Sequence, residues 1–187
     1  YSAGYRIATI AAAVAGASAA AIIATTLTGT AATVAVILLA VFALTRLVIG
    51  FFPMDAPGTP VTATGRLHNL LAFGAFGSVT AAAFVVAGAI HDAGDPGLAS
   101  ASTWLGVVMA VGAVALFVTA RVERAKRWFG AAERLIYVGF ILWFAAIGVD
   151  AGLRGARDLG ALRTISYEEI GVGMLQDAIW ADGERLE

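Results

Sequence analysis

Apolar stretches of roughly twenty residues alternate with short polar segments along the chain. Stretches of this length, almost free of charged side chains, are long enough to cross a bilayer. Five such stretches occur, at residues 7–26, 31–52, 67–90, 103–120 and 135–151. The pattern predicts an all-α fold, a polytopic transmembrane helical bundle with five spans.

The C-terminal segment has a different composition. We assign residues 1–152 to the bundle and residues 153–187 to an extramembrane tail, which becomes acidic over residues 168–187. Helical spacing would place four apolar side chains of the tail on one stripe: Ile170, Met174, Ile179 and Trp180. Such a stripe needs a surface to pack against, although Gly171 and Gly173 disfavour a helix. The tail is therefore a candidate docking helix.

Composition supports a membrane protein and excludes several classes of function. Of the 187 residues, 60% are hydrophobic and 13% charged, whereas soluble domains are typically about 25% charged. The net charge of −1 gives no basic footprint for nucleic acid. The absence of cysteine excludes disulfides, thiolate zinc sites and iron–sulfur clusters. The first apolar stretch has no basic leader or small-residue cleavage site, so we interpret it as a mature helix.

Basic residues predict the orientation. The densest cluster lies between the fourth and fifth spans and comprises Arg121, Arg124, Lys126, Arg127 and Arg134. Short loops rich in Lys and Arg stay cytoplasmic. Loops 53–66 and 121–134 are then on one face of the cell membrane, the cytoplasmic face, and the loop with His91 faces outside. Five aromatic residues are predicted to face lipid or the membrane interface: Phe51, Phe52, Trp104, Trp128 and Trp143.

Three polar residues on the predicted cytoplasmic face are candidates for catalysis or metal binding. Asp55 and His68 flank the loop between spans two and three, and Glu133 opens span five. A carboxylate and an imidazole at an apolar boundary can bind a metal or transfer protons. Glu133 would complete the three protein ligands of a catalytic zinc site. The alternative is structural: Asp55 caps or solvates the loop, His68 bonds a backbone carbonyl, and Glu133 is a helix-start acid.

Two arginines are candidates for a ligand or an ion pair. Arg46 lies about two turns inside span two, where a charge is costly and usually faces the bundle interior or snorkels. Pairing with Asp55 or Glu133 is the most economical account of Arg46. Arg134 is interpreted as a snorkelling base, and in an enzyme or transporter either Arg46 or Arg134 would hold an anionic headgroup.

Other cofactor chemistry is not expected. His68 and His91 are separated by 23 residues of one predicted helix, or roughly 35 Å. They cannot share a site, so bis-histidine haem is not expected. The sequence also has no Gly-rich phosphate loop and no GxSxG nucleophile motif.

Three short motifs carry a family resemblance: residues 52–55 (FPMD), 65–68 (GRLH) and 130–134 (GAAER). They resemble domain-of-unknown-function family 998, a group of small bacterial and archaeal membrane proteins that usually have six helices. The resemblance covers roughly residues 5–152 and implies that Asp55, His68, Glu133 and Arg134 are signature positions. It implies no activity, and the five spans differ from the family's usual six.

Two functions remain open. The sequence favours a non-catalytic accessory or scaffold subunit, with the lipid bilayer and other membrane-protein subunits as partners and residues 168–187 as a docking element. The alternative is an intramembrane metal-dependent hydrolase or a transporter-like protein that uses Asp55, His68 and Glu133. The alternative requires these side chains to converge on one cavity, whereas the first function predicts that they are paired off among themselves and buried, with no cavity.

Overall fold

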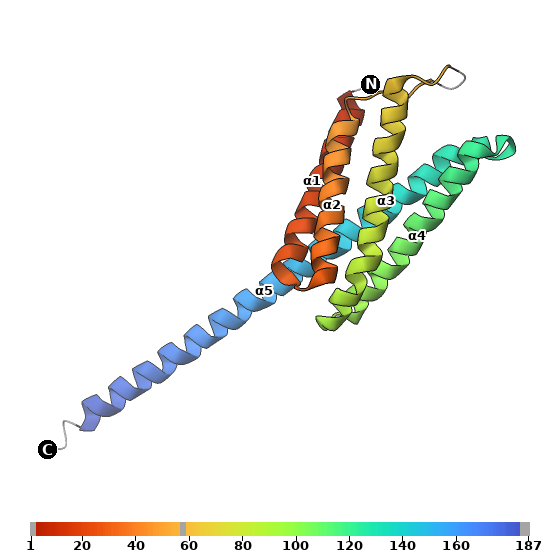
Figure 1. Cartoon of the computed structure of the whole chain (residues 1–187). Helices are drawn as coiled ribbons and strands as arrows, with labels where there is room; N and C mark the ends of the chain where they lie inside the picture. Colours follow the sequence, from red (N-terminus) through yellow and green to blue (C-terminus); the bar gives the residue numbers. More distant parts are fainter. Residues whose placement is uncertain (1–2, 57–58, 184–187) are drawn as a thin grey trace. The chain divides into compact units, whose positions relative to one another are not determined.

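The part of the chain that the structure describes contains helices and the loops that connect them, and no strands. The computed structural model describes residues 3–56 and 59–183, with side chains described as far as residue 158. The helices are α1 (Ala3–Thr26), α2 (Thr30–Ile49), α3 (Ala63–Asp92), α4 (Pro96–Arg121), a 3-10 helix η1 (Glu123–Trp128) and α5 (Phe129–Gly183) (Figure 1). Among the described residues, five helices are long and apolar enough to cross a membrane. The predicted all-α transmembrane fold with five spans is confirmed.

α3 and α4 begin before the predicted spans, because a polar residue caps the start of each helix. α3 begins four residues before the predicted start at 67, because Thr62 caps it by accepting a hydrogen bond from the backbone N–H of Gly65 at 3.0 Å. α4 begins seven residues before the predicted start at 103, because Asp95 accepts from the N–H of Leu98 at 2.8 Å. Such caps satisfy backbone donors that lack a partner within the helix. Apolar patterning alone does not locate these capped starts.

The chain divides into two compact units, residues 1–148 and 149–187. In the first unit α1 packs on α2, α2 on α3 and α3 on α4, and consecutive helices run antiparallel (Figure 1). The α2–α3 connection and η1 therefore lie at the same end of this unit.

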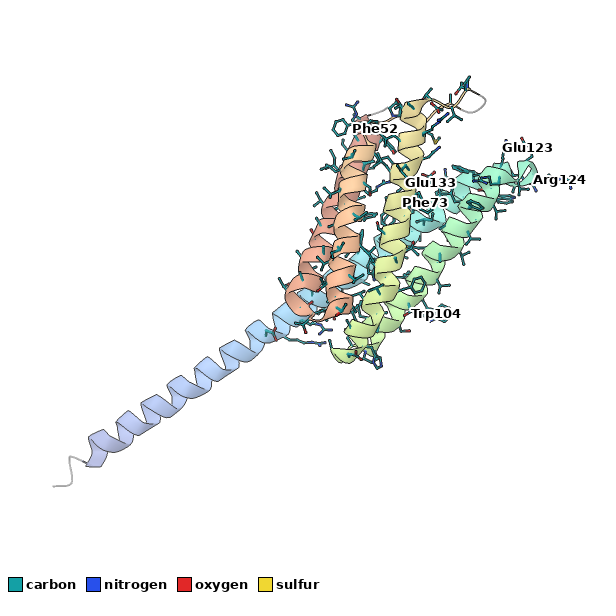
Figure 2. All side chains as sticks on the ribbon, viewed as in Figure 1. Phe52, Phe73, Trp104, Glu123, Arg124 and Glu133 are labelled. Atoms are coloured by element: carbon teal, nitrogen blue, oxygen red, sulfur yellow. The ribbon has the colours of Figure 1, made fainter. Side chains whose placement is uncertain are left out.

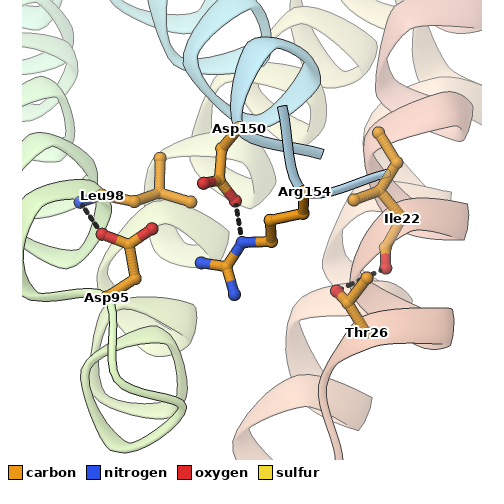
Figure 3. A network of polar contacts seen from close by, with 6 residues as sticks. All are labelled: Ile22, Thr26, Asp95, Leu98, Asp150 and Arg154. Carbon is orange, nitrogen blue, oxygen red and sulfur yellow. Dashed lines mark hydrogen bonds and ion pairs between the residues drawn. The ribbon is translucent and has the colours of Figure 1, made fainter. Parts of the chain in front are cut away.

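The second unit continues α5 to Gly183. An ion pair joins two residues one turn apart on α5: Nε of Arg154 donates to Oδ2 of Asp150 at 2.8 Å (Figure 3). The proposed stripe of Ile170, Met174, Ile179 and Trp180 lies outside the described side chains.

Aromatic side chains join α5 to the other helices of the first unit. The Phe42 ring on α2 packs edge-on against Phe140 and Phe144, with centroids 5.3 and 5.4 Å apart. Trp143 is fully buried, and its Nε1 donates to Oγ of Ser102 on α4 at 3.0 Å. The prediction that Trp143 faces lipid was therefore wrong, whereas Trp104 on α4 is exposed (Figure 2). Burial of the tryptophan is possible because Ser102 satisfies its donor.

Glycines allow α4 and α5 to approach closely. A methyl group built at Gly112 would lie 2.7 Å from Cγ1 of Ile136 and 3.1 Å from its backbone nitrogen. A methyl group at Gly139 would lie 2.5 Å from Cγ of Met109. Small residues at such contacts let helix backbones pack together in lipid.

Candidate functional site

The connection between α2 and α3 holds the first candidate residue, Asp55. Its Oδ2 accepts a hydrogen bond from the backbone N–H of Thr62 at 2.9 Å, and its Oδ1 accepts from the Thr62 hydroxyl at 2.7 Å. The hydroxyl and then the backbone N–H of Thr62 lower the pKa of Asp55 below the usual 3.8. The bonds favour the charged form. Asp55 thus closes the loop onto the residue that caps α3.

Gly65 provides the space in which the Asp55 carboxylate lies. A Cβ atom built at Gly65 would overlap with the carboxylate atoms of Asp55. Gly65 also donates its backbone N–H to the hydroxyl of Thr62. The glycine of the GRLH motif is therefore required by the aspartate of the FPMD motif.

His68 joins the same two motifs at a second point. Its side chain is 8% exposed, and Nδ1 lies 2.8 Å from the carbonyl oxygen of Phe52. Because a carbonyl only accepts, Nδ1 must carry the proton in this contact. The imidazole therefore fixes the first turns of α3 to the chain just beyond the end of α2.

Glu133 and Arg134 lie in the second turn of α5 (Glu133 is labelled in Figure 2). Glu133 is half-buried and Arg134 is exposed. Within the described ranges, no three His, Asp or Glu side chains are grouped so that they could hold a metal ion. Asp55, His68 and Glu133 share one end of the bundle, but the structure does not bring them together as ligands.

Arg46 is the most unusual charged residue of the bundle. Its side chain is only 1% exposed, and its Cζ lies 5.2 Å from the centroid of the Tyr137 ring on α5. Nε and Nη1 are buried and have no hydrogen-bond partner within the described part of the chain. Among the described residues no ion pair joins Arg46 to a carboxylate, so the expected pairing with Asp55 or Glu133 is not formed.

A groove of about 490 Å³ lies between α1 and the first part of α5. Its lining residues are mostly small on α1 and mostly large on α5: Ala8, Ala11, Ala12, Ala15, Ser18, Ala19, Ile22, Tyr137, Phe140, Ile141, Phe144, Ala145 and Gly148. Only Ser18 and Tyr137 contribute polar side-chain atoms. Tyr137 lines this groove, and its ring also faces the guanidinium of Arg46.

Residues 3–150 match the family model described as "Protein of unknown function (DUF998)". The chain belongs to this family. The matched segment contains all three motifs that suggested the resemblance. No curated protein and no solved structure matches the chain.

The family match gives no activity. The motifs are therefore interpreted from the contacts that their residues make. Two of the three motifs, FPMD and GRLH, contact each other through Asp55 and His68. Sequence reasoning did not identify Tyr137 as part of a site. Its position one turn after Glu133 was a signal, but a tyrosine in an apolar helix resembles ordinary core until its neighbours are known.

Proposed function

We propose that the protein is a non-catalytic accessory subunit that packs against other helices in a membrane assembly. The observation that carries this proposal is the use of Asp55 and His68 to close the α2–α3 connection. Both Asp55 oxygens accept hydrogen bonds from Thr62, and His68 is buried against Phe52. These contacts support a structural role for the two signature residues.

A metal-dependent hydrolase would need a different arrangement. A catalytic metal centre requires about three protein ligands around an open coordination position. Asp55, His68 and Glu133 do not supply such a group in this fold. Elemental analysis of purified protein separates the two functions. Near-unit bound metal that is lost in His68→Ala would support the hydrolase, whereas the accessory role expects the same metal content in both proteins.

An outward face of α3 offers a packing surface for a partner. Phe73, Gly77, Phe84 and Gly88 are spaced by four, seven and four residues, which places them on one side of the helix. Phe73 is 78% exposed, whereas Phe84 is 41% exposed because its ring packs over Gly106 of α4. A Cβ built at Gly77 or Gly88 meets no atom within 4 Å. Alternating large and small residues suit close helix–helix contact in lipid.

The α3 face defines the test of the accessory role. A photocrosslinking residue is placed at Gly77 in intact membranes, with the exposed Ala40 of α2 as the control position. We expect one protein adduct of fixed mass at position 77, which disappears when Gly88→Leu fills the same face. Position 40 should give lipid adducts only. Lipid adducts alone at both positions would contradict the proposal.

We further propose that loops 53–66 and 121–134 face the cytoplasm and that the tail contributes to docking. The support for this orientation is the cluster of Arg and Lys residues in and beside η1.

A further inference from the structure

No carboxylate among the described residues pairs with the buried guanidinium of Arg46. Arginine stays protonated in proteins, so the side chain carries a full positive charge. A buried charge without a partner is strongly unfavourable. The face of Tyr137 at 5.2 Å supplies a cation–π contact, which leaves Nε and Nη1 without an acceptor. An acceptor from outside the chain would complete the site.

Arg46 lies at a depth that a lipid headgroup can reach. It is three residues before Ile49, the last residue of α2, which corresponds to about 4.5 Å along the helix axis. An arginine this close to a membrane face usually extends its side chain into water. Here the side chain instead lies in the protein interior, against Tyr137 of α5.

The α1–α5 groove extends from the same end of the bundle toward the membrane interior. From Ala8 to Ile22 it follows α1 for about 21 Å. One leaflet of the hydrocarbon core is about 15 Å thick, so a single acyl chain fits lengthwise. The groove volume of about 490 Å³ falls within the range of small-ligand sites.

Arg134 is a second cation on the side of α5 that lines the groove. It precedes Tyr137 by three residues and Ile141 by seven, so it lies on the groove-lining face of α5. Its side chain is exposed. Tyr137 therefore has a buried arginine over its ring and an exposed arginine one turn before it.

We propose that this region binds one anionic phospholipid. One acyl chain lies in the α1–α5 groove, and the phosphodiester accepts hydrogen bonds from Arg46 and Arg134. Phosphate oxygens match the planar donor pattern of arginine and form strong, charge-assisted hydrogen bonds. A partner helix would fill the groove but would supply an anion only if it also carried a carboxylate at this depth. A phospholipid supplies both parts.

The test compares phosphatidylglycerol with phosphatidylcholine of the same acyl chains, added to purified protein in neutral detergent. Binding is measured by native mass spectrometry, and stability by thermal unfolding. For the wild-type chain we expect phosphatidylglycerol to bind about tenfold more tightly. Arg46→Met and Arg134→Gln should remove most of this preference, whereas Arg124→Gln, in the exposed η1, should retain it. Ala15→Leu should weaken the binding of both lipids, because the larger side chain fills the groove.

The buried charge also predicts that added lipid reverses the order of the unfolding temperatures of wild type and Arg46→Met. Without lipid, Arg46→Met should unfold at a higher temperature than wild type, because an uncompensated charge is removed. Saturating phosphatidylglycerol should raise the unfolding temperature of wild type above that of Arg46→Met. If Arg46→Met does not fold, the wild-type lipid comparison with Arg134→Gln and Ala15→Leu decides the question.

Four results would overturn the proposal. Equal affinity for the two lipids would remove the requirement for an anion. Protection by inorganic phosphate equal to that by phosphatidylglycerol would indicate a free-anion site. A protein adduct from a photocrosslinker at Ala15 in membranes would assign the groove to a partner helix. Equal destabilisation by Glu133→Gln and Arg46→Met without lipid would identify Glu133 as the partner of Arg46.

Discussion

The carboxylate of Asp55 occupies the space that a side chain at Gly65 would need. Asp55 lies ten residues before Gly65, and the loop between them folds back so that Thr62 donates two hydrogen bonds to the carboxylate. The hydroxyl of Thr62 meanwhile accepts from the N–H of Gly65. Capping of α3 and closure of the loop are therefore one structure.

Gly65→Ala should destabilise the bundle because the added methyl group displaces the carboxylate from Thr62. Overpacking of this kind typically costs about 1–3 kcal/mol. The measurement is unfolding by SDS in mixed micelles. Gly77→Ala is the matched control in the same helix, because a methyl group there meets nothing within 4 Å. It should be neutral or stabilising by up to about 1 kcal/mol, since alanine favours helix. Equal effects of the two substitutions would contradict this account.

Asp55 should make stability depend on pH in the acid range. The Thr62 hydrogen bonds lower the pKa of the folded-state carboxyl below 3.8. A lowered folded-state pKa adds stability that is fully present above the unfolded-state pKa and is lost as pH falls through the folded-state pKa. The readout is the difference in unfolding temperature between wild type and Asp55→Asn, measured from neutral pH into the acid range. That difference should shrink below pH 3.8. A constant difference would show that the charge of Asp55 is not involved.

His68 should be replaceable by a residue that keeps its donor. Asparagine can place an N–H near the position of Nδ1 and bond the Phe52 carbonyl, whereas leucine cannot. Loss of a buried hydrogen-bond partner costs about 1–3 kcal/mol. We expect His68→Leu to lower stability by this amount and His68→Asn to recover part of it, both measured by SDS unfolding. If His68→Leu were at least as stable as His68→Asn, the hydrogen bond to the Phe52 carbonyl would not contribute to stability.

The arrangement of spans followed from the sequence because apolar length is a strong local signal. The structural alternative for Asp55 and His68 was also accessible, since a carboxylate and an imidazole beside a loop commonly bond backbone groups. The hydrogen-bond partners of Asp55 and His68 could not be predicted from the sequence. Thr62 and Phe52 become partners only when the chain between α2 and α3 folds back.

The surroundings of Trp143 and Arg46 could not be predicted from the sequence. A tryptophan in an apolar span is often found facing lipid or the membrane interface. Trp143 is buried instead, because Ser102 on α4 accepts the hydrogen bond of its indole N–H. Arg46 was expected to pair with an acid, because nearby acids exist in the sequence. Which side chain faces the guanidinium depends on the rotation of α5, and that rotation presents Tyr137.

The proposed orientation can be tested with single cysteines, because the natural chain has none. Asp92→Cys and Arg124→Cys place exposed thiols on opposite ends of the bundle. A membrane-impermeant maleimide should label position 92 in intact cells and position 124 only after permeabilisation. The basic cluster around η1 is the reason for this expectation. The reverse pattern would invert the orientation.

Gly112→Ala should separate α4 from α5 and lower stability. The added methyl group would lie 3.1 Å from the backbone nitrogen of Ile136 and 3.2 Å from the carbonyl oxygen of Ala132. Because these are backbone atoms, a change of side-chain rotamer cannot relieve the contact, and the helices must move apart. We expect a loss of about 1–3 kcal/mol in SDS unfolding. Gly88→Ala, which meets no neighbour, serves as the control. If Gly112→Ala were as stable as this control, α4 and α5 would not pack as closely as the structure shows.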